Sequence, residues 1–121
     1  MLKEVKKIFI LDDDQSVRRS LSMLLGTYGF IVDVFSCAED FFNAVPDSVT
    51  GCLILDIHMP GTDGWAVLER IVKSGVRRPV IIISADKREV SHERAIKTGA
   101  IGYLHKPFIS QALVDLIQAS C

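Results

Sequence analysis

Carboxylates, a hydroxyl and an ammonium follow four short apolar runs in this sequence. Asp12 and Asp13 come after the first run, Asp56 ends the second, Ser84 ends the third, and the last leads to Lys106. Such runs, separated by helical stretches, are typical of buried parallel strands. The carboxyl ends of parallel strands share one edge of an open α/β sheet, where ligands bind. We therefore expect these side chains to converge on one site.

Three carboxylates at one sheet edge repel one another and raise each other's pKa values unless a cation intervenes. Lys106 supplies one positive charge, and a bound Mg²⁺ would supply two more. Mg²⁺ is typically held by one or two carboxylates together with water and phosphate oxygens. The lysine ammonium is a compact point charge that suits phosphate. The set therefore predicts a site for a divalent metal ion and a phosphoryl group.

Each of these residues, taken alone, also has a structural explanation. Asp13 or Asp14 can cap the helix that follows, because a carboxylate accepts hydrogen bonds from the first N–H groups of a helix. Asp56 and Ser84 can be turn residues, and Lys106 can be an exposed lysine with a buried stem. Capping and turn roles do not explain why three carboxylates meet at one edge, so we favour the metal and phosphoryl interpretation.

The elements that position these groups alternate five times between strand and helix, without a linker or a low-complexity segment. Strands are expected at about 6–11, 31–34, 52–55, 80–83 and 102–104. Helices with apolar residues at helical spacing follow them. This alternation implies right-handed crossovers and a parallel sheet covered on both faces, a three-layer α/β/α sandwich. Composition alone leaves the strand order open.

Two elements are expected to be held less firmly than the rest of this fold. Asp33 interrupts the second strand, which therefore suits an edge of the sheet. The helix at 88–98 is mostly polar and has only Val90, Ala95 and Ile96 to bury. We expect it to be the least firmly anchored helix, and so the one most able to move.

Size and charge exclude several classes of function. The chain has 121 residues, enough for one domain with one hydrophobic core. Its net charge of −1 argues against nucleic acid or an anionic membrane as a partner recognised by bulk charge. The charged N-terminus precedes an apolar run far too short to span a bilayer. We expect a cytoplasmic protein that binds neither membrane nor nucleic acid directly.

Four segments together resemble the receiver domains of bacterial two-component response regulators. They are 8–18 (IFILDDDQSVR), 55–64 (LDIHMPGTDG), 80–85 (VIIISA) and 99–108 (GAIGYLHKPF). They occur in the family's order and spacing and span essentially the whole chain. The resemblance implies a flavodoxin-like (βα)5 fold with strand order 2-1-3-4-5. It also implies that residues 1–121 are a single receiver domain, with no output domain in this chain.

The resemblance assigns the acidic residues to phosphoryl transfer. Asp56 matches the phosphoacceptor, which takes its phosphoryl group from a sensor histidine kinase or a phosphotransfer protein. Asp12 and Asp13 match the acidic pair that holds Mg²⁺, for which Mn²⁺ or Ca²⁺ can substitute. Asp13, Asp56 and the backbone carbonyl of His58 would be direct ligands, with Asp12 acting mainly through water. The side chains of His58 and Asp14 are not assigned.

The remaining matches imply a switch. Lys106 matches the lysine that contacts the phosphoryl group, Ser84 the hydroxyl switch residue and Tyr103 the aromatic one. Phosphorylation would then change the surface of the fourth helix, the fifth strand and the last helix to control an output domain or target protein. Such a protein is not an enzyme, apart from assisting its own phosphorylation and dephosphorylation. A homodimer that forms on phosphorylation is left open.

Two other functions compete with this one. Residues 12–16 nearly satisfy the D-x-D-x-T/V motif of haloacid-dehalogenase-like phosphatases, with Asp12 as nucleophile and Asp14 as acid/base. That class is usually longer, and it leaves Asp56 and Lys106 unexplained. The second alternative is a receiver-like binding module that is never phosphorylated, although its acceptor set would then have no purpose.

Overall fold

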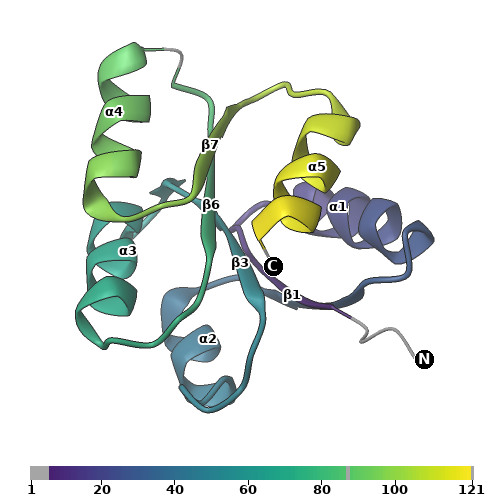
Figure 1. The fold of residues 1–121 in the computed structure, drawn as a ribbon, viewed down its shortest axis with the longest axis horizontal. Helices are drawn as coiled ribbons and strands as arrows, with labels where there is room; N and C mark the ends of the chain where they lie inside the picture. The colour runs from purple at the N-terminus through teal and green to yellow at the C-terminus, as the bar shows by residue number, and fades with distance from the viewer. Residues whose placement is uncertain (1–5, 87, 121) are drawn as a thin grey trace.

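The computed structural model describes residues 6–86 and 88–120. Its strands and helices occur in this order (Figure 1): β1 (Lys7–Leu11), α1 (Gln15–Thr27), β2 (Ile31–Phe35), α2 (Ala38–Ala44), β3 (Cys52–Asp56), β4 (His58–Met59), β5 (Thr62–Asp63), α3 (Gly64–Lys73), β6 (Val80–Ser84), α4 (Glu89–Thr98), β7 (Gly102–His105) and α5 (Ser110–Ser120). Among the described residues, no helix combines the length and the apolar character that crossing a bilayer requires.

The main sheet has five parallel strands in the order β2-β1-β3-β6-β7. This is the expected order 2-1-3-4-5 once the short β4 and β5 are set aside. Helices α1 and α5 cover one face, and α2, α3 and α4 cover the other (Figure 1). The predicted flavodoxin-like three-layer sandwich is confirmed, with β2 at an edge as Asp33 indicated.

Each face of the sheet buries its own apolar set. Successive residues of a strand point to opposite faces, so Phe9 and Leu11 pack with α2 and α3 whereas Ile8 and Ile10 pack with α1 and α5. Every residue of β3 and β6 is buried. Strands buried on both faces hold a fixed register, which also fixes the positions of the polar residues at their ends.

The prediction for α4 was wrong in detail. Val90 and Ile96, expected to be buried, are 61% and 46% exposed. Ala95 is buried as expected, together with Ser91. The helix therefore packs through small side chains and presents two of its large apolar residues to solvent.

A small hairpin between β3 and α3 was not predicted. β4 and β5 pair antiparallel, with His58 opposite Asp63 and Met59 opposite Thr62. A Cβ on Gly64 would lie 2.6 Å from the Cα of Ile57, so only glycine permits this close approach. The hairpin thus folds the loop after Asp56 tightly against the start of α3.

Candidate phosphoryl and metal site

The carboxyl ends of the central strands bring the predicted residues to one edge. Asp12 directly follows β1, Asp56 ends β3 and Ser84 ends β6. Leu11 pairs with Leu55 and Ser84 pairs with His105, so the strand ends are level. Lys106 directly follows β7 and precedes a cis peptide bond to Pro107.

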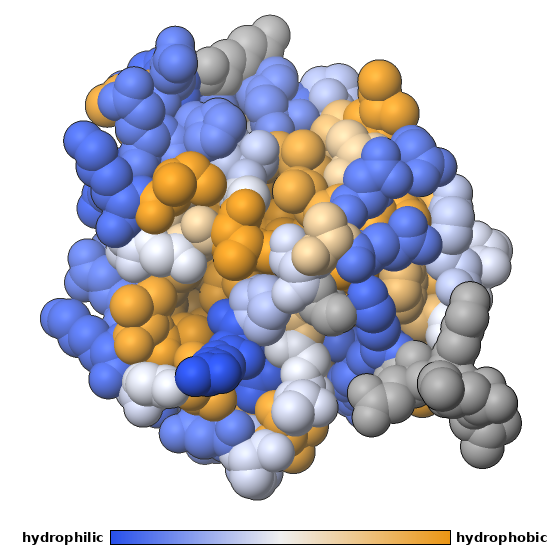
Figure 2. Space-filling model, in the orientation of Figure 1, coloured by the Kyte–Doolittle hydropathy of each residue, from blue (hydrophilic) through white to orange (hydrophobic). Residues whose placement is uncertain are grey.

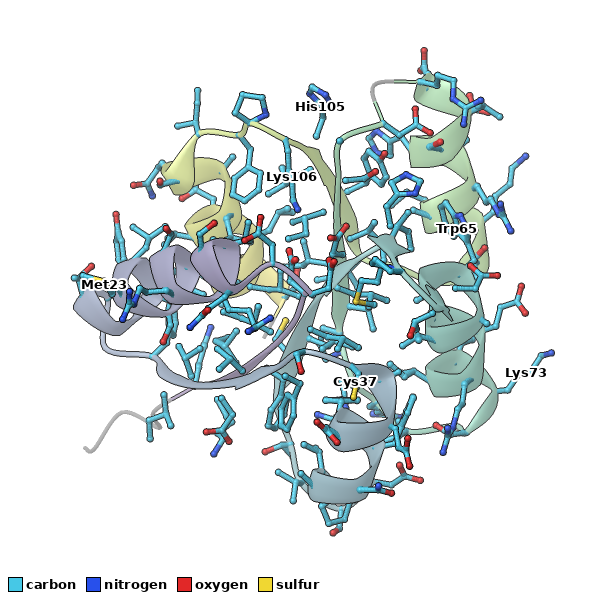
Figure 3. The ribbon with its side chains drawn as sticks, turned by 180° about the vertical axis from the view of Figure 1, so that it is seen from behind. Met23, Cys37, Trp65, Lys73, His105 and Lys106 are labelled. Carbon is cyan, nitrogen blue, oxygen red and sulfur yellow. The ribbon has the colours of Figure 1, made fainter. Side chains whose placement is uncertain are left out.

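Lys106 contacts two of the three carboxylates. Its Nζ lies 3.2 Å from Oδ2 of Asp12 and 3.5 Å from Oδ2 of Asp56. The side chain points from the loop after β7 toward the ends of the central strands (Figure 3). Asp12 is fully buried and Asp56 is 5% exposed, so this pairing is largely shielded from water. A single ammonium is shared between two buried acids.

Asp12, Asp13 and Asp56 each place a carboxylate oxygen within 4.8 Å of the others. Three carboxylates and one ammonium leave an excess of two negative charges, which suits a divalent cation. Asp12 uses both oxygens, one with Lys106 and one with the N–H of Asp14 at 2.9 Å. Among the described residues, no hydrogen bond reaches the exposed Asp13 carboxylate. The donor set therefore fits a hard metal ion.

The pKa of Asp56 is raised above its ordinary value. Burial is the largest cause and the neighbouring charge of Asp12 the second. The N–H of His58, which donates to Oδ1 of Asp56 at 3.1 Å, and Lys106 act in the opposite direction without cancelling the effect. The positive charge near the Asp56 carboxylate is therefore too small to offset its burial and the negative charge of Asp12.

Helix capping at α1 belongs to Asp14. Its Oδ1 accepts the N–H of Ser16 at 2.9 Å and the Ser16 hydroxyl at 2.7 Å. These hydrogen bonds hold the pKa of Asp14 below its usual value. The capping alternative left open for Asp13 or Asp14 is therefore resolved, and Asp13 is not used as the cap.

Ser84 and Tyr103 both contact the loop that follows β6. Ser84 is fully buried, and its Oγ accepts the N–H of Asp86 at 3.0 Å. The Tyr103 hydroxyl donates to the carbonyl of Asp86 at 2.7 Å. The Tyr103 ring stacks on His92, with centroids 5.5 Å apart and planes at 15°. Tyr103 is thus fixed between the loop and α4.

Sequence reasoning missed Asp86 and His92. An acidic residue shortly before a helix is a capping signal, and Asp86 could have been noticed on that ground. The contact of Asp86 with Tyr103 bridges 17 positions and has no local signal. The stacking of His92 depends on how α4 is placed and has no sequence signal either.

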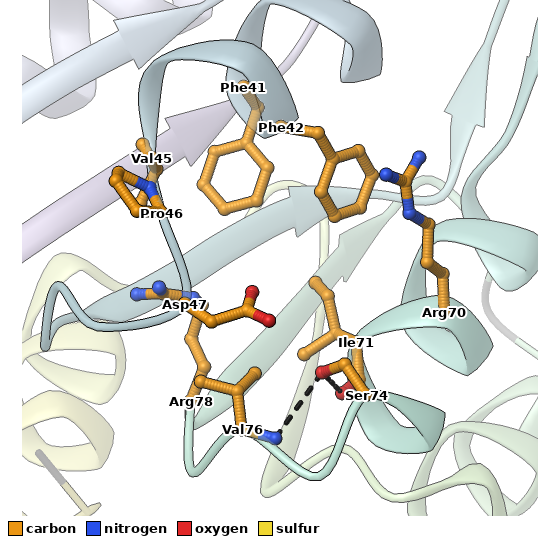
Figure 4. Close-up of a pocket in the computed structure, with 10 residues that line it drawn as sticks. All are labelled: Phe41, Phe42, Val45, Pro46, Asp47, Arg70, Ile71, Ser74, Val76 and Arg78. Carbon is orange, nitrogen blue, oxygen red and sulfur yellow. Dashed lines mark hydrogen bonds between the residues drawn. The ribbon is translucent and has the colours of Figure 1, made fainter.

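A cavity of about 160 Å³ lies between α2 and α3 (Figure 4). Phe41, Phe42, Arg70 and Arg78 are among its lining residues. Arg78 precedes β6, so the cavity lies toward the amino end of that strand and away from Asp56. None of the predicted site residues lines it.

A flavodoxin-like sheet with a lysine and three carboxylates at its carboxyl edge defines a class of acidic α/β domain that is compatible with Mg²⁺ and phosphorylation. Residues 8–118 match the response regulator receiver domain family. The chain belongs to this family, whose members are the receiver domains of two-component systems. They are signalling switches and generally not enzymes.

The relatives of the chain agree with this assignment. The response regulator protein TodT from Pseudomonas putida is 40% identical over 113 residues, which cover 93% of this chain and 50% of TodT. The transcriptional regulatory protein FixJ from Bradyrhizobium diazoefficiens is 34% identical over 113 residues, which cover 93% of this chain and 55% of FixJ. The solved structure of the response regulator StyR superposes with a TM-score of 0.87 at 38% identity. The superposition covers 97% of this chain and 59% of the StyR chain. The chain thus spans about half the length of these three relatives.

Proposed function

We propose that this chain is a phosphorylation-activated switch whose phosphoacceptor is Asp56. The observation that supports this most is the shared ammonium of Lys106, which lies 3.2 Å from Asp12 and 3.5 Å from Asp56. Asp13 completes a set of three carboxylates within 4.8 Å. The phosphodonor is a sensor histidine kinase or a phosphotransfer protein.

Asp56 is a better acceptor than Asp12. Asp12 is fully buried, and both its oxygens already accept protein hydrogen bonds. Asp56 retains slight exposure, and its Oδ2 lies beside Lys106 at the longer of the two distances. This favours a receiver over a phosphatase with Asp12 as nucleophile.

In the proposed reaction a carboxylate oxygen of Asp56 attacks phosphorus. A P–O bond forms, and the bond from phosphorus to the leaving group breaks, with the electron pair going to the leaving group. Lys106 stabilises the charge on the transferred phosphoryl oxygens, so the protein contributes mainly position and electrostatics. Hydrolysis of the acyl phosphate resets the switch. Beyond assisting these two steps on itself, the domain is proposed to have no enzymatic activity.

The metal proposed for this site is Mg²⁺, with Mn²⁺ or Ca²⁺ as substitutes. Asp13, Asp56 and the backbone carbonyl of His58 would hold it, with Asp12 acting mainly through water. When bound, the metal neutralises charge on the carboxylates and on the phosphoryl oxygens.

The proposed output is a change in the surface of α4, β7 and α5. Four large apolar residues are at least 38% exposed there: Val90 and Ile96 on α4, Ile101 directly before β7 and Ile109 directly before α5. Figure 2 shows apolar residues gathered over the middle of one face, flanked by hydrophilic residues on the outer sides of α3 and α4. The partner is proposed to be an output domain or a target protein. FixJ is named a transcriptional regulatory protein, which suits an output of that kind.

Phosphate labelling tests the proposal. Wild type, Asp56→Asn and Asp12→Asn are incubated with Mg²⁺ and labelled acetyl phosphate, and the labile phosphate is mapped by mass spectrometry. We expect label on Asp56 in wild type and none in Asp56→Asn. Label that survives Asp56→Asn but is lost in Asp12→Asn would support the phosphatase. Absence of label in all three proteins would support the alternative of a receiver-like binding module that is never phosphorylated.

A further inference from the structure

The cavity between α2 and α3 has a largely apolar wall. Phe41 and Phe42 of α2 line it, with their ring centroids 5.2 Å apart and their planes at 68° (Figure 4). The other apolar lining residues are Val45, Pro46, Ile71 and Val76. An apolar cavity of about 150 Å³ engineered into another protein takes up benzene. The cavity of about 160 Å³ in this chain therefore has room for one aromatic ring.

Arg78 adds a buried positive charge to the cavity lining. The residue is 8% exposed, and its guanidinium donates to the carbonyl of Gly51 at 3.0 Å and to that of Val49 at 2.9 Å. A guanidinium has more N–H donors than these two hydrogen bonds use. Among the described residues, no carboxylate forms an ion pair with Arg78. Burial lowers the pKa of Arg78, although the charge of Asp47 acts in the opposite direction. Its charge is therefore incompletely neutralised, which is unfavourable for a buried group.

Positive charge is concentrated around the same cavity. The segment 70–78 contains four cationic residues and no acidic one, namely Arg70, Lys73, Arg77 and Arg78. The exposed Arg70 lines the cavity, and its Cζ lies 3.7 Å from the centroid of the Phe42 ring. Asp47 is the one acidic residue of the lining, so the two lining arginines leave an excess of one positive charge. The cavity therefore favours an anion.

We propose that this cavity binds a small aromatic carboxylate. The ring of the ligand would lie beside Phe41 and Phe42, and its carboxylate would accept hydrogen bonds from the guanidinium of Arg78, with Arg70 adding a second positive charge. Guanidinium and carboxylate match in shape and charge, and their hydrogen bonds are of the stronger, charge-assisted kind. An apolar cavity with a few polar groups that fix orientation is typical of small-molecule sites. The site is separate from Asp56 and does not depend on the proposed function.

The alternative is that Arg78 has only a structural role. Its two hydrogen bonds tie the segment before β3 to the start of β6, and the cavity would then hold nothing but water. Asp47 separates the two explanations, because it is exposed and no hydrogen bond or ion pair among the described residues involves its side chain. Removing its negative charge should strengthen the binding of an anion and leave the binding of a neutral ring unchanged.

The experiment is a titration of the ¹⁵N-labelled chain, followed by the backbone amide signals in NMR spectra. Sodium benzoate is the probe, benzyl alcohol supplies a similar ring without the charge, and sodium acetate supplies the charge without the ring. Wild type is compared with Asp47→Asn, Arg70→Met and Arg78→Met. Arg94→Met is the matched control, because Arg94 also stacks on a ring, 4.2 Å from that of Trp65, but does not line the cavity. Arg78→Met removes a buried group, so the two variants at exposed positions test the proposal even if it fails to fold.

We expect benzoate to shift the amide signals of residues 41–47 and 70–78 and to saturate. Benzyl alcohol and acetate should bind at least about tenfold more weakly, since each lacks one half of the interaction. Asp47→Asn should bind benzoate about two- to fivefold more tightly, and Arg70→Met about three- to tenfold more weakly. Folded Arg78→Met should lose most of the binding, and Arg94→Met should resemble wild type.

Three results would overturn the proposal. The first is the absence of saturable shifts with benzoate in wild type. The second is saturable shifts confined to the residues around Asp12 and Lys106, which would place the anion at the other positively charged group. The third is equal binding of benzoate and benzyl alcohol, with no effect of Asp47→Asn or Arg70→Met on either. None of these results would bear on phosphorylation of Asp56, which is tested by labelling.

Discussion

The Nζ of Lys106 lies 3.2 Å from Oδ2 of Asp12, although the two residues are 94 positions apart in the chain. Lys106 lies 0.3 Å farther from Asp56, at 3.5 Å, so its charge is divided between the two buried acids. The pKa of Asp56 remains raised despite this neighbouring ammonium, because the carboxyl is buried and because the charge of Asp12 lies close to it.

Replacing Asp56 should stabilise the metal-free protein at neutral pH. Its folded-state pKa lies above the ordinary value of 3.8, so the folded state binds a proton more readily than the unfolded state. Ionisation of Asp56 therefore lowers stability as pH rises from 3.8 through the raised pKa. We expect Asp56→Asn to raise the Tm at pH 7 by about 4 °C, roughly 1 kcal/mol for a domain of this size.

Calorimetry in EDTA between pH 3 and pH 8 checks this prediction. The gain should vanish below pH 3.8, where Asp56 is protonated in both states. Asp115→Asn, at an exposed position of α5, serves as the control for changing a carboxylate to an amide on the surface. A gain in Tm that is constant across the pH range would contradict the charge explanation.

Removing the ammonium of Lys106 should destabilise the protein and make it depend more on metal. Lys106→Met leaves Asp12 buried without its cationic partner, which should cost about 1–3 kcal/mol in the free energy of unfolding. Mg²⁺ should restore part of this loss, because it supplies positive charge to the same carboxylates. Urea unfolding with and without Mg²⁺ gives both quantities.

Lys73→Met is the control for this experiment, since Lys73 is exposed in the last turn of α3. Its stability should change by less than about 0.5 kcal/mol, as for most surface substitutions. If Mg²⁺ stabilised Lys106→Met no more than wild type, the lysine and the metal would not act on the same charge cluster.

The sequence was sufficient to place the acidic cluster because its residues end or follow β3 and β1, whose apolar residues are all buried. Such a strand cannot slip without exposing its apolar side chains, so Asp56 and Ser84 had to lie at one edge. Val90 and Ile96 could not be placed in this way. Helical periodicity shows which residues share a face, but not whether another element covers it, and α4 packs through Ser91 and Ala95 instead.

Neighbouring acidic residues should have separate roles. Asp13 accepts no hydrogen bond from the described residues, whereas Asp14 caps α1 through Ser16. We expect Asp13→Ala to retain the metal-free Tm but to lose most of the stabilisation by Mg²⁺. Asp14→Ala should lower the metal-free Tm and keep the response to Mg²⁺. Thermal unfolding over a Mg²⁺ titration measures both effects.

The pH dependence gives an internal check on the capping role. The folded-state pKa of Asp14 is lowered, so its stabilisation is present above the ordinary value of 3.8 and is lost as pH falls through the lowered pKa. The Tm difference between Asp14→Ala and wild type should therefore shrink in strong acid. An Asp14→Ala variant that lost the Mg²⁺ response while Asp13→Ala kept it would reverse the two assignments.

His92 should restrain Tyr103 through their stacked rings. Aromatic stacking contributes about 0.5–1.5 kcal/mol, so His92→Ala should raise the population of freed Tyr103 rings about two- to tenfold. Nitration by tetranitromethane measures this, because the chain has two tyrosines and the other, Tyr28, is 45% exposed and far from α4 in sequence. The Tyr103 rate should rise relative to that of Tyr28, which serves as the internal standard. Equal nitration ratios in wild type and His92→Ala would show that the hydrogen bond to Asp86 alone holds Tyr103 in place.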